Sequence, residues 1–284
     1  MKLSLYAALI GLGLVRGVLA HGDLHEQIEE ISRRIRRAPS AELFLKRGEL
    51  HRAHQDFEPA LADYDAAERR RPGMEAVLFC RGRTLFEAGR FAPARASLDR
   101  FLQAKPEHAE GYLMRARVNA ALKDFGAAVK DFDRVIELAP GAGPDQFLER
   151  AQAQGAQGDF DGAIKVLDEA MLRIGPLFTL QAQAVEVERT RKSFDAALGR
   201  VDDILAQAQR KESWLMEKGA ILEEAGRPEE AQRSYQAALA AIEALPPHLH
   251  ATKATQEIES RSRLRAQSLA PHLSSALASP TPVP

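Results

Sequence analysis

The sequence contains very little cysteine and few aromatic residues. Cys80 is the only cysteine in 284 residues, so the chain cannot build an intramolecular disulfide framework and has no CxxC metal or redox motif. Aromatic residues make up only 6% of the chain, whereas alanine, leucine, glutamate and arginine recur throughout. Because that composition favours helices over strands, we expect a helix-rich protein without thiol chemistry.

A surplus of charge of either sign is also missing. The chain has 39 lysines and arginines against 40 aspartates and glutamates, which gives a formal net charge of -1. Domains that bind nucleic acid usually carry a basic surplus, so we expect no nucleic-acid partner. No nucleophile–base pair, paired acidic site or phosphate-binding glycine loop stands out in the sequence, so we predict that the protein is not an enzyme.

The one long apolar run lies at the N-terminus. The stretch Leu3–Val15 has no charged residue, and Val18 and Ala20 are the compact residues expected at positions -3 and -1 of a signal-peptidase site. This layout predicts a signal peptide over residues 1–20, cleaved between Ala20 and His21, and a periplasmic or secreted protein without membrane contact after cleavage. About 13 apolar residues are short for a span across about 30 Å of hydrocarbon, but an uncleaved anchor stays an alternative.

Cleavage at this position would place a histidine at the new N-terminus. The α-amine and ring nitrogens of His21, with His25 four residues later, suit copper and resemble the histidine brace of some exported copper proteins. Copper binding by His21 and His25 is therefore an alternative function, and otherwise we expect no cofactor. His51 and His54 also stand at a metal-binding spacing, but no third ligand is evident, and we predict that they lie at the edge of the core.

Most of the remaining sequence repeats with a period of about 34 residues. The clearest marker is an alanine that recurs at one position of every unit, at Ala60, Ala94, Ala128, Ala163, Ala197 and Ala231. A bulky side chain lies four residues after each of these alanines, at Tyr64, Leu98, Phe132, Leu167, Val201 and Tyr235. Small residues, with one valine, lie twelve residues before them, at Gly48, Gly82, Ala116, Ala151, Val185 and Gly219. Prolines close the first three units, at Pro72, Pro106 and Pro140.

This period and these residue types resemble the tetratricopeptide repeat, a pair of antiparallel helices. The resemblance implies an all-α, right-handed superhelical solenoid of about six helix hairpins with a capping helix at each end. We assign the N-terminal cap to residues 21–40 with Asp23 as its N-cap, and the C-terminal cap to 246–270. The repeats between them span 41–74, 75–108, 109–143, 144–177, 178–211 and 212–245. The Ser/Pro-rich stretch 271–284 is predicted to be disordered.

Physical reasoning agrees with the resemblance. Small residues let the two helices of a unit cross closely, because a larger side chain would hold them apart. Gly89, Gly158 and Gly226 fall just after a first helix, where glycine adopts a positive φ at little cost. The repeat 178–211 fits least well, with Glu188 at a bulky position and Gln209 in place of the closing proline. We expect either that its second helix runs on into the next repeat or that the solenoid bends there.

An arginine recurs at one repeat position, at Arg47, Arg81, Arg115 and Arg150. Such a ladder could bind phosphates or carboxylates. The position faces the second helix of its own unit, however, where Asp63 and Asp131 lie within reach. We therefore predict ion pairs inside the fold.

In the family that the repeats resemble, variable positions of the first helices line a concave surface that binds peptides or partner proteins. Carried onto this sequence, those positions hold Glu42, Leu45, Glu49, Phe79, Arg83, Glu110, Leu113, Arg117, Leu148, Glu149, Glu186, Met216 and Glu217. Five apolar residues among them share one position and would form a stripe, while acidic residues outnumber basic ones.

These groove residues predict a non-catalytic scaffold or adaptor that binds a protein segment with an apolar and cationic bias. Alternatively, the stripe packs between neighbouring first helices and the acids only keep the surface soluble. An RNA-binding helical repeat is a weaker alternative, because an acidic groove repels phosphate. The oligomeric state stays open.

Overall fold

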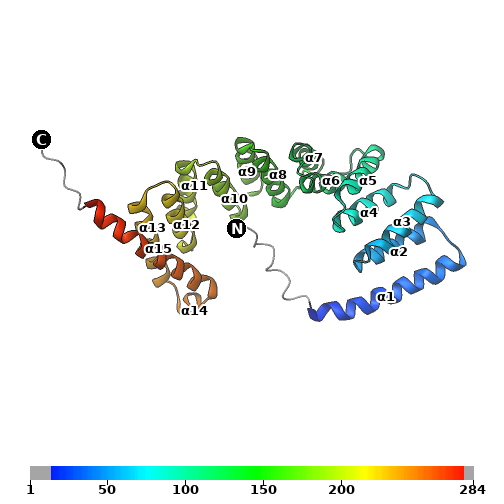
Figure 1. Ribbon diagram of the computed structural model, residues 1–284, viewed down its shortest axis with the longest axis horizontal. Helices are drawn as coiled ribbons and strands as arrows, with labels where there is room; N and C mark the ends of the chain where they lie inside the picture. Colours follow the sequence, from blue (N-terminus) through cyan, green and yellow to red (C-terminus); the bar gives the residue numbers. More distant parts are fainter. Residues whose placement is uncertain (1–13, 278–284) are drawn as a thin grey trace. The chain divides into compact units, whose positions relative to one another are not determined.

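The computed structural model describes the backbone of residues 14–277 and the side chains of residues 24–269. All regular structure in residues 14–277 is helical, which confirms the predicted all-α class (Figure 1). The helices are α1 (Leu14–Arg37), α2 (Ala41–Ala53), α3 (Phe57–Arg70), α4 (Glu75–Glu87), α5 (Phe91–Ala104), α6 (Ala109–Ala121), α7 (Phe125–Leu138), α8 (Pro144–Gln157), α9 (Phe160–Ile174), α10 (Phe178–Thr190), α11 (Phe194–Gln207), α12 (Glu212–Glu224), α13 (Pro228–Glu243), α14 (Pro247–His250) and α15 (Lys253–Leu277).

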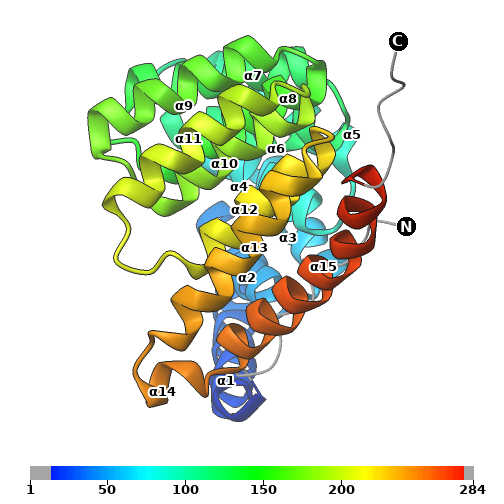
Figure 2. The same cartoon turned by 90° about the vertical axis from the view of Figure 1, so that its left-hand side faces the viewer.

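The helices form two compact units, one up to Ala142 and one from Gly143 onwards. In the first unit, α1 packs on α2, and the hairpins α2–α3, α4–α5 and α6–α7 follow one another. In the second unit, the hairpins α8–α9, α10–α11 and α12–α13 stack in the same way, and α15 lies beside α13 (Figure 2). Within each hairpin, the first helix comes from the start of a repeat and the second from its end.

One buried layer repeats through all six hairpins. The recurrent alanines, from Ala60 to Ala231, are all 0% exposed, and the bulky residues four positions later are at most 2% exposed. An added Cβ on Gly48 would lie 2.6 Å from the Tyr64 ring, and one on Gly219 would lie 2.7 Å from the Tyr235 ring. The small residue is therefore required by the large one opposite, and this pairing fixes how closely the two helices approach.

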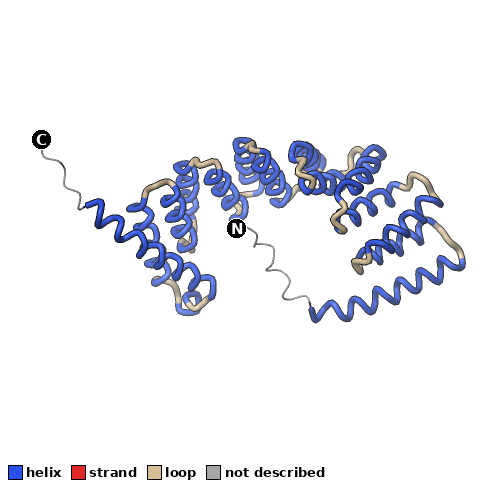
Figure 3. The backbone as a smooth tube through the Cα atoms, in the orientation of Figure 1, coloured by secondary structure: helices blue, strands red, loops and turns tan. Residues whose placement is uncertain are grey.

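Short turns join the paired helices (Figure 3), and the backbone angles of these turns show a shared geometry. The glycines predicted to adopt a positive φ do so, at +72° in Gly89, +89° in Gly158 and +72° in Gly226. The other three repeats place a longer residue in the same conformation, at Gln55, Lys123 and Lys192. In all six turns, the next residue donates its backbone N–H to the carbonyl five positions earlier, at 2.8 to 2.9 Å. This is the Schellman pattern that satisfies the last carbonyls of a helix.

Two members of the arginine ladder, Arg47 and Arg115, form the predicted ion pairs. Arg47 donates two hydrogen bonds to Asp63, at 2.8 and 2.6 Å, and Arg115 does the same to Asp131 at identical distances. Both aspartates are 4% exposed, so each pair ties a first helix to its own second helix inside the fold. Arg81 instead donates to Asp65 of the preceding hairpin at 2.9 Å.

The N-terminal helix begins earlier than predicted. Helix α1 starts at Leu14 and runs through the predicted cleavage site, so Asp23 lies inside the helix and the prediction of an N-cap there is wrong for the full chain. Residues 14–20, which precede the predicted cut, form the first part of this helix. Ile31 is buried and Ile35 packs against the first hairpin, so this helix covers the first repeat as expected. The predicted signal peptide lies largely outside the described residues.

The C-terminal cap also differs from the predicted range 246–270. A short helix, α14, comes first, and α15 then runs to Leu277, so the predicted disorder is wrong for residues 271–277. Leucine and alanine in this stretch have high helix propensity, which outweighs the serine content and the internal proline. The buried residues of α15 include Thr255, Ser262 and Ala266, small side chains that allow a close approach to the preceding hairpin. Residues 278–284 lie outside the described part.

The repeat 178–211 ends cleanly despite its atypical sequence. Helix α11 stops at Gln207, and α12 begins only at Glu212, so the second helix does not run on. Glu188, which replaces a bulky residue, is 2% exposed. Its carboxylate accepts a hydrogen bond from Arg191 at 2.6 Å, and Arg200 contacts it at 3.4 Å. Two arginines therefore replace the missing apolar contact.

Candidate functional site

The predicted groove residues all lie on first helices of the hairpins. In the first unit they are Glu42, Leu45 and Glu49 on α2, Phe79 and Arg83 on α4, and Glu110, Leu113 and Arg117 on α6. In the second unit they are Leu148 and Glu149 on α8, Glu186 on α10, and Met216 and Glu217 on α12. Neighbouring first helices contact each other within each unit, α2 with α4, α4 with α6, and α8 with α10. Each unit therefore has a face built from first helices.

The apolar stripe is largely used for packing in the first unit. Its five members are all half-buried: Leu45, Phe79, Leu113, Leu148 and Met216. The Phe79 ring lies 5.1 Å from the Phe101 ring and 5.5 Å from the His108 ring, and the Arg83 guanidinium stacks on it at 5.7 Å. Phe79 therefore packs against the second helix of its own hairpin and the residue that precedes α6, whereas the alternative interpretation expected packing between neighbouring first helices.

The charged groove residues of the first unit neutralise one another. Glu49 accepts a hydrogen bond from the Tyr64 hydroxyl at 2.6 Å and also pairs with Arg83. Arg52 donates to Glu87 at 2.9 Å. Burial, together with the hydrogen bond to Glu49, raises the pKa of Tyr64 far above its ordinary value. These pairs leave little free negative charge on this part of the first-helix face.

Cys80 lies beside the same group of charges. Burial and then the nearby Glu49 carboxylate raise the pKa of the Cys80 thiol to about 12. A thiol with such a pKa stays protonated at neutral pH and is a poor nucleophile or metal ligand.

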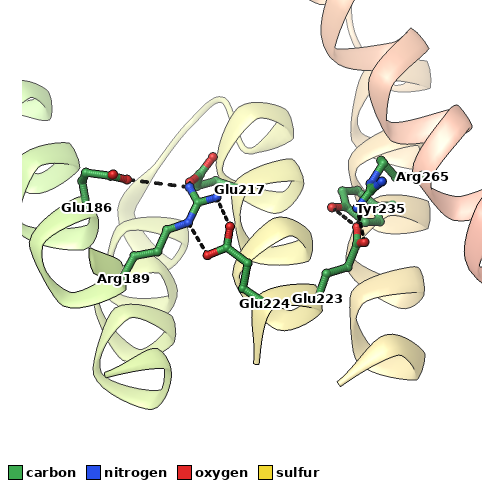
Figure 4. A network of polar contacts seen from close by, with 7 residues as sticks. All are labelled: Glu186, Arg189, Glu217, Glu223, Glu224, Tyr235 and Arg265. Carbon is green, nitrogen blue, oxygen red and sulfur yellow. Dashed lines mark hydrogen bonds and ion pairs between the residues drawn. The ribbon is translucent and has the colours of Figure 1, made fainter. Parts of the chain in front are cut away.

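The second unit has a different charge balance. The Arg189 guanidinium donates to Glu217 and to Glu224, each at 2.7 Å, and lies 3.7 Å from Glu186 (Figure 4). One cation therefore faces three carboxylates. Beside this cluster, Tyr235 donates to Glu223 at 2.6 Å, and Arg265 of the capping helix pairs with the same carboxylate (Figure 4).

Three adjoining hollows lie around the first helices of the second unit. One, of about 220 Å³, is lined by Phe178, Ala182, Val185, Glu186, Ser213, Trp214, Met216 and Glu217. A hollow of about 420 Å³ shares Phe178 and Trp214 with it and extends towards Ile258. Another, of about 370 Å³, shares Met216 and Glu217 and extends to Leu264 and Arg265 of α15.

Sequence analysis missed the two aromatic residues of these hollows, Phe178 and Trp214. Their rings lie 5.3 Å apart, and Phe178 is 63% exposed whereas Trp214 is 7% exposed. A sequence signal for Phe178 did exist. It is the first residue of α10, and the other five hairpins begin with a small, charged or proline residue, namely Ala41, Glu75, Ala109, Pro144 and Glu212.

The histidines do not come together as a metal site. His51 and His54 both face Asp56, at 3.7 and 2.9 Å. Within the part of the chain whose side chains are described, no three histidine, cysteine or acidic residues are grouped to hold a metal ion. His25 is exposed on α1, and the side chains of Ala20 and His21 lie outside the described residues.

Among the described residues, no helix combines the length and the apolar character that crossing a bilayer requires.

Known proteins share both the sequence pattern and the fold. Residues 81–143 match the sequence profile of the tetratricopeptide repeat family. No curated protein matches the sequence as a relative.

Solved structures resemble the chain at low sequence identity. A tetratricopeptide repeat protein from Parabacteroides merdae ATCC 43184 is 17% identical, with a TM-score of 0.54 over 86% of this chain and 94% of that one. Residues 41 to the end of MamA from Desulfovibrio magneticus RS-1 are 16% identical, with a TM-score of 0.52 over 58% and 93%. The structure of Naa15/Naa10 bound to HypK-THB is 15% identical, with a TM-score of 0.55 over 79% of this chain and 36% of that one.

These comparisons agree with the geometry of the hairpins. The profile match covers the middle of the chain, and the same buried layer and the same Schellman turn recur in the hairpins on both sides of it. The chain therefore has the tetratricopeptide repeat fold, and residues 81–143 carry the sequence pattern of that family.

Proposed function

We propose that this protein is a non-catalytic scaffold that binds a segment of another protein on its first-helix faces. The tetratricopeptide repeat fold suggests a protein-interaction scaffold. The observation that carries the proposal is the run of hollows on the first helices of the second unit, beside an exposed aromatic residue, Phe178. Hollows that expose apolar side chains are typical of surfaces that bind other molecules.

The charges of the described residues favour a protein partner over a nucleic acid. Arg189 is the only cation within the cluster that it forms with Glu186, Glu217 and Glu224, so this part of the surface carries excess negative charge. Phosphate groups would be repelled there, whereas lysine and arginine side chains would be attracted. Some structures with this fold are of protein complexes, as the name of Naa15/Naa10 bound to HypK-THB states.

Export and copper binding remain proposals from the sequence of the N-terminus. The intact mass of the protein from its native compartment tests the cut between Ala20 and His21. Copper titration of that mature chain, against its His21→Ala variant, tests the histidines. Equal copper affinity of the two forms would remove the copper proposal.

The main proposal is tested by affinity capture with surface variants. The test variant reverses three exposed acids on first helices, Glu42→Lys, Glu110→Lys and Glu186→Lys. A matched control reverses two exposed acids on second helices, Glu58→Lys and Glu243→Lys. We expect partners recovered by the wild type and by the control to be lost from the test variant. Equal recovery by all three forms would contradict binding on the first-helix faces.

A further inference from the structure

Phe178 occupies a position where the fold does not need an aromatic side chain. Its ring is 63% exposed although it is the first residue of α10, and the exposed Leu177 precedes it. Removing aromatic surface from water is favourable, and the exposed part of Phe178 has not realised that gain in this chain. A partner that covers it would obtain that gain.

The Phe178 ring forms one wall of an apolar hollow. We call the hollow between α10 and α12 the Phe178–Trp214 pocket and define it by Phe178, Ala182, Val185, Trp214 and Met216. Its volume of about 220 Å³ is of the order of one large side chain and below the roughly 300–1,000 Å³ of small-molecule sites. The pocket therefore fits one apolar side chain rather than a whole organic ligand.

Two carboxylates and no cation line the same pocket. Glu217 is already held by Arg189, but the Glu186 side chain is 60% exposed and only approaches Arg189 at 3.7 Å. Since Arg189 approaches Glu186 less closely than it approaches Glu217, a cation at the rim of the pocket would be attracted to Glu186. This charge complementarity indicates a basic residue beside the apolar side chain that would enter the pocket.

We propose that the Phe178–Trp214 pocket binds a leucine-sized or aromatic side chain from a partner protein, with a lysine or arginine beside it that pairs with Glu186. This inference rests on the proposed scaffold function and names the partner chemistry of one site. The acidic rim disfavours a nucleic-acid occupant. A second copy of this chain is the other occupant that the experiment distinguishes.

The chain provides its own reporter for this site. Trp214 is the only tryptophan in the sequence, and it lines the pocket. Binding in the pocket therefore changes the environment of the one indole ring, which intrinsic fluorescence detects directly. The neighbouring hollow of about 420 Å³ also contains Trp214 but not Glu186, so loss of binding in Glu186→Lys assigns a fluorescence change to the Phe178–Trp214 pocket.

The probe is a phage-displayed library of random twelve-residue peptides, selected on the immobilised full chain. Enriched sequences are then synthesised and titrated in solution, with Trp214 fluorescence and calorimetry as two separate readouts. The test variants are Phe178→Ser and Glu186→Lys, both at exposed positions where folding is preserved. The controls are Leu172→Ser, an apolar residue that is 89% exposed and does not line the pocket, and Glu243→Lys on α13.

We expect enriched peptides to combine an apolar residue with a neighbouring lysine or arginine and to shift Trp214 fluorescence. Phe178→Ser should weaken the binding of these peptides by about tenfold or more, and Glu186→Lys should weaken it by about threefold to tenfold. Both control variants should bind the peptides as tightly as the wild type does. Peptides that bind by calorimetry without a fluorescence change, or equally well to Phe178→Ser, would overturn the pocket while leaving the scaffold function intact. A failure to enrich any peptide would also overturn it.

Self-association of the chain is measured in parallel by sedimentation equilibrium. If the wild type dimerises and Phe178→Ser is a monomer, the occupant is a second copy and the partner-segment proposal is wrong. The proposed scaffold function is tested separately, by affinity capture. It is contradicted if every variant of the first-helix faces recovers the same proteins as the wild type.

Discussion

The shared left-handed turn predicts opposite effects for two glycine-to-alanine substitutions in the second unit. Gly226 follows α12 with φ at +72°, whereas Gly199 lies inside α11. An added Cβ meets nothing within 4 Å at either position, so no steric clash contributes. The two substitutions therefore differ in backbone conformation alone.

The magnitudes follow from that difference. A left-handed conformation costs a residue with a Cβ about 1–2 kcal/mol, and alanine regains about 0.4–1 kcal/mol by restricting the unfolded chain. We expect Gly226→Ala to lower the free energy of unfolding by about 1 kcal/mol, and Gly199→Ala to raise it by about 0.5–1 kcal/mol. The reverse change, Lys192→Gly, relieves a φ of +63° and should stabilise the unit by about 0.5 kcal/mol.

Urea unfolding followed by Trp214 fluorescence measures all three variants, because Trp214 lies in the core of the same unit. With a urea dependence of about 2 kcal/mol per molar, 1 kcal/mol moves the midpoint by about 0.5 M. Midpoints that fall for Gly226→Ala and rise for Gly199→Ala are the expected result. If both substitutions move the midpoint in the same direction, the conformational argument is refuted.

Three further predictions concern packing, a buried ion pair and the thiol. Gly219→Ala places a Cβ 2.7 Å from the Tyr235 ring and should lower the free energy of unfolding by about 1–3 kcal/mol, measured by the same urea titration. Arg115→Ala leaves the Asp131 carboxylate buried without its main partner and should cost about 3 kcal/mol, measured by thermal or urea unfolding. The native Cys80 thiol, with a pKa of about 12 against an ordinary value of 9.0, should react with iodoacetamide at pH 8.5 at least tenfold more slowly than in urea. Because the folded pKa is the higher one, this thiol supports folding below pH 9 and that contribution is lost as the pH rises towards 12. Rapid alkylation of the folded chain would contradict the burial of the thiol.

The sequence predicted the parts of the fold that depend on steric pairing. A small residue opposite a bulky one is needed wherever two helices cross closely, so the alternation that includes Gly48 and Tyr64 is visible as a period. The turns were predictable only where they contain glycine. Gln55, Lys123 and Lys192 adopt the same conformation because the surrounding helices impose it, and no local sequence signal marks them.

The candidate site was harder to predict than the fold. The positions of Glu49 and Glu217 on first helices followed from the repeat register, but their neutralisation by Arg83 and Arg189 depends on side chains that reach across 34 and 28 residues of sequence. For that reason, the net charge of the groove cannot be predicted from the numbers of its acidic and basic residues alone. Phe178 could have been found by comparing the first residue of each hairpin.

The central claim is that a partner protein contacts the first-helix faces. Carbodiimide labelling of carboxylates, read by mass spectrometry with and without the captured partner, tests it most directly. The account predicts that the partner reduces labelling of one or more of Glu42, Glu110 and Glu186 and leaves Glu58 and Glu243 on the second helices unchanged. Reduced labelling confined to the second-helix residues, or no change at any of the five, would contradict it.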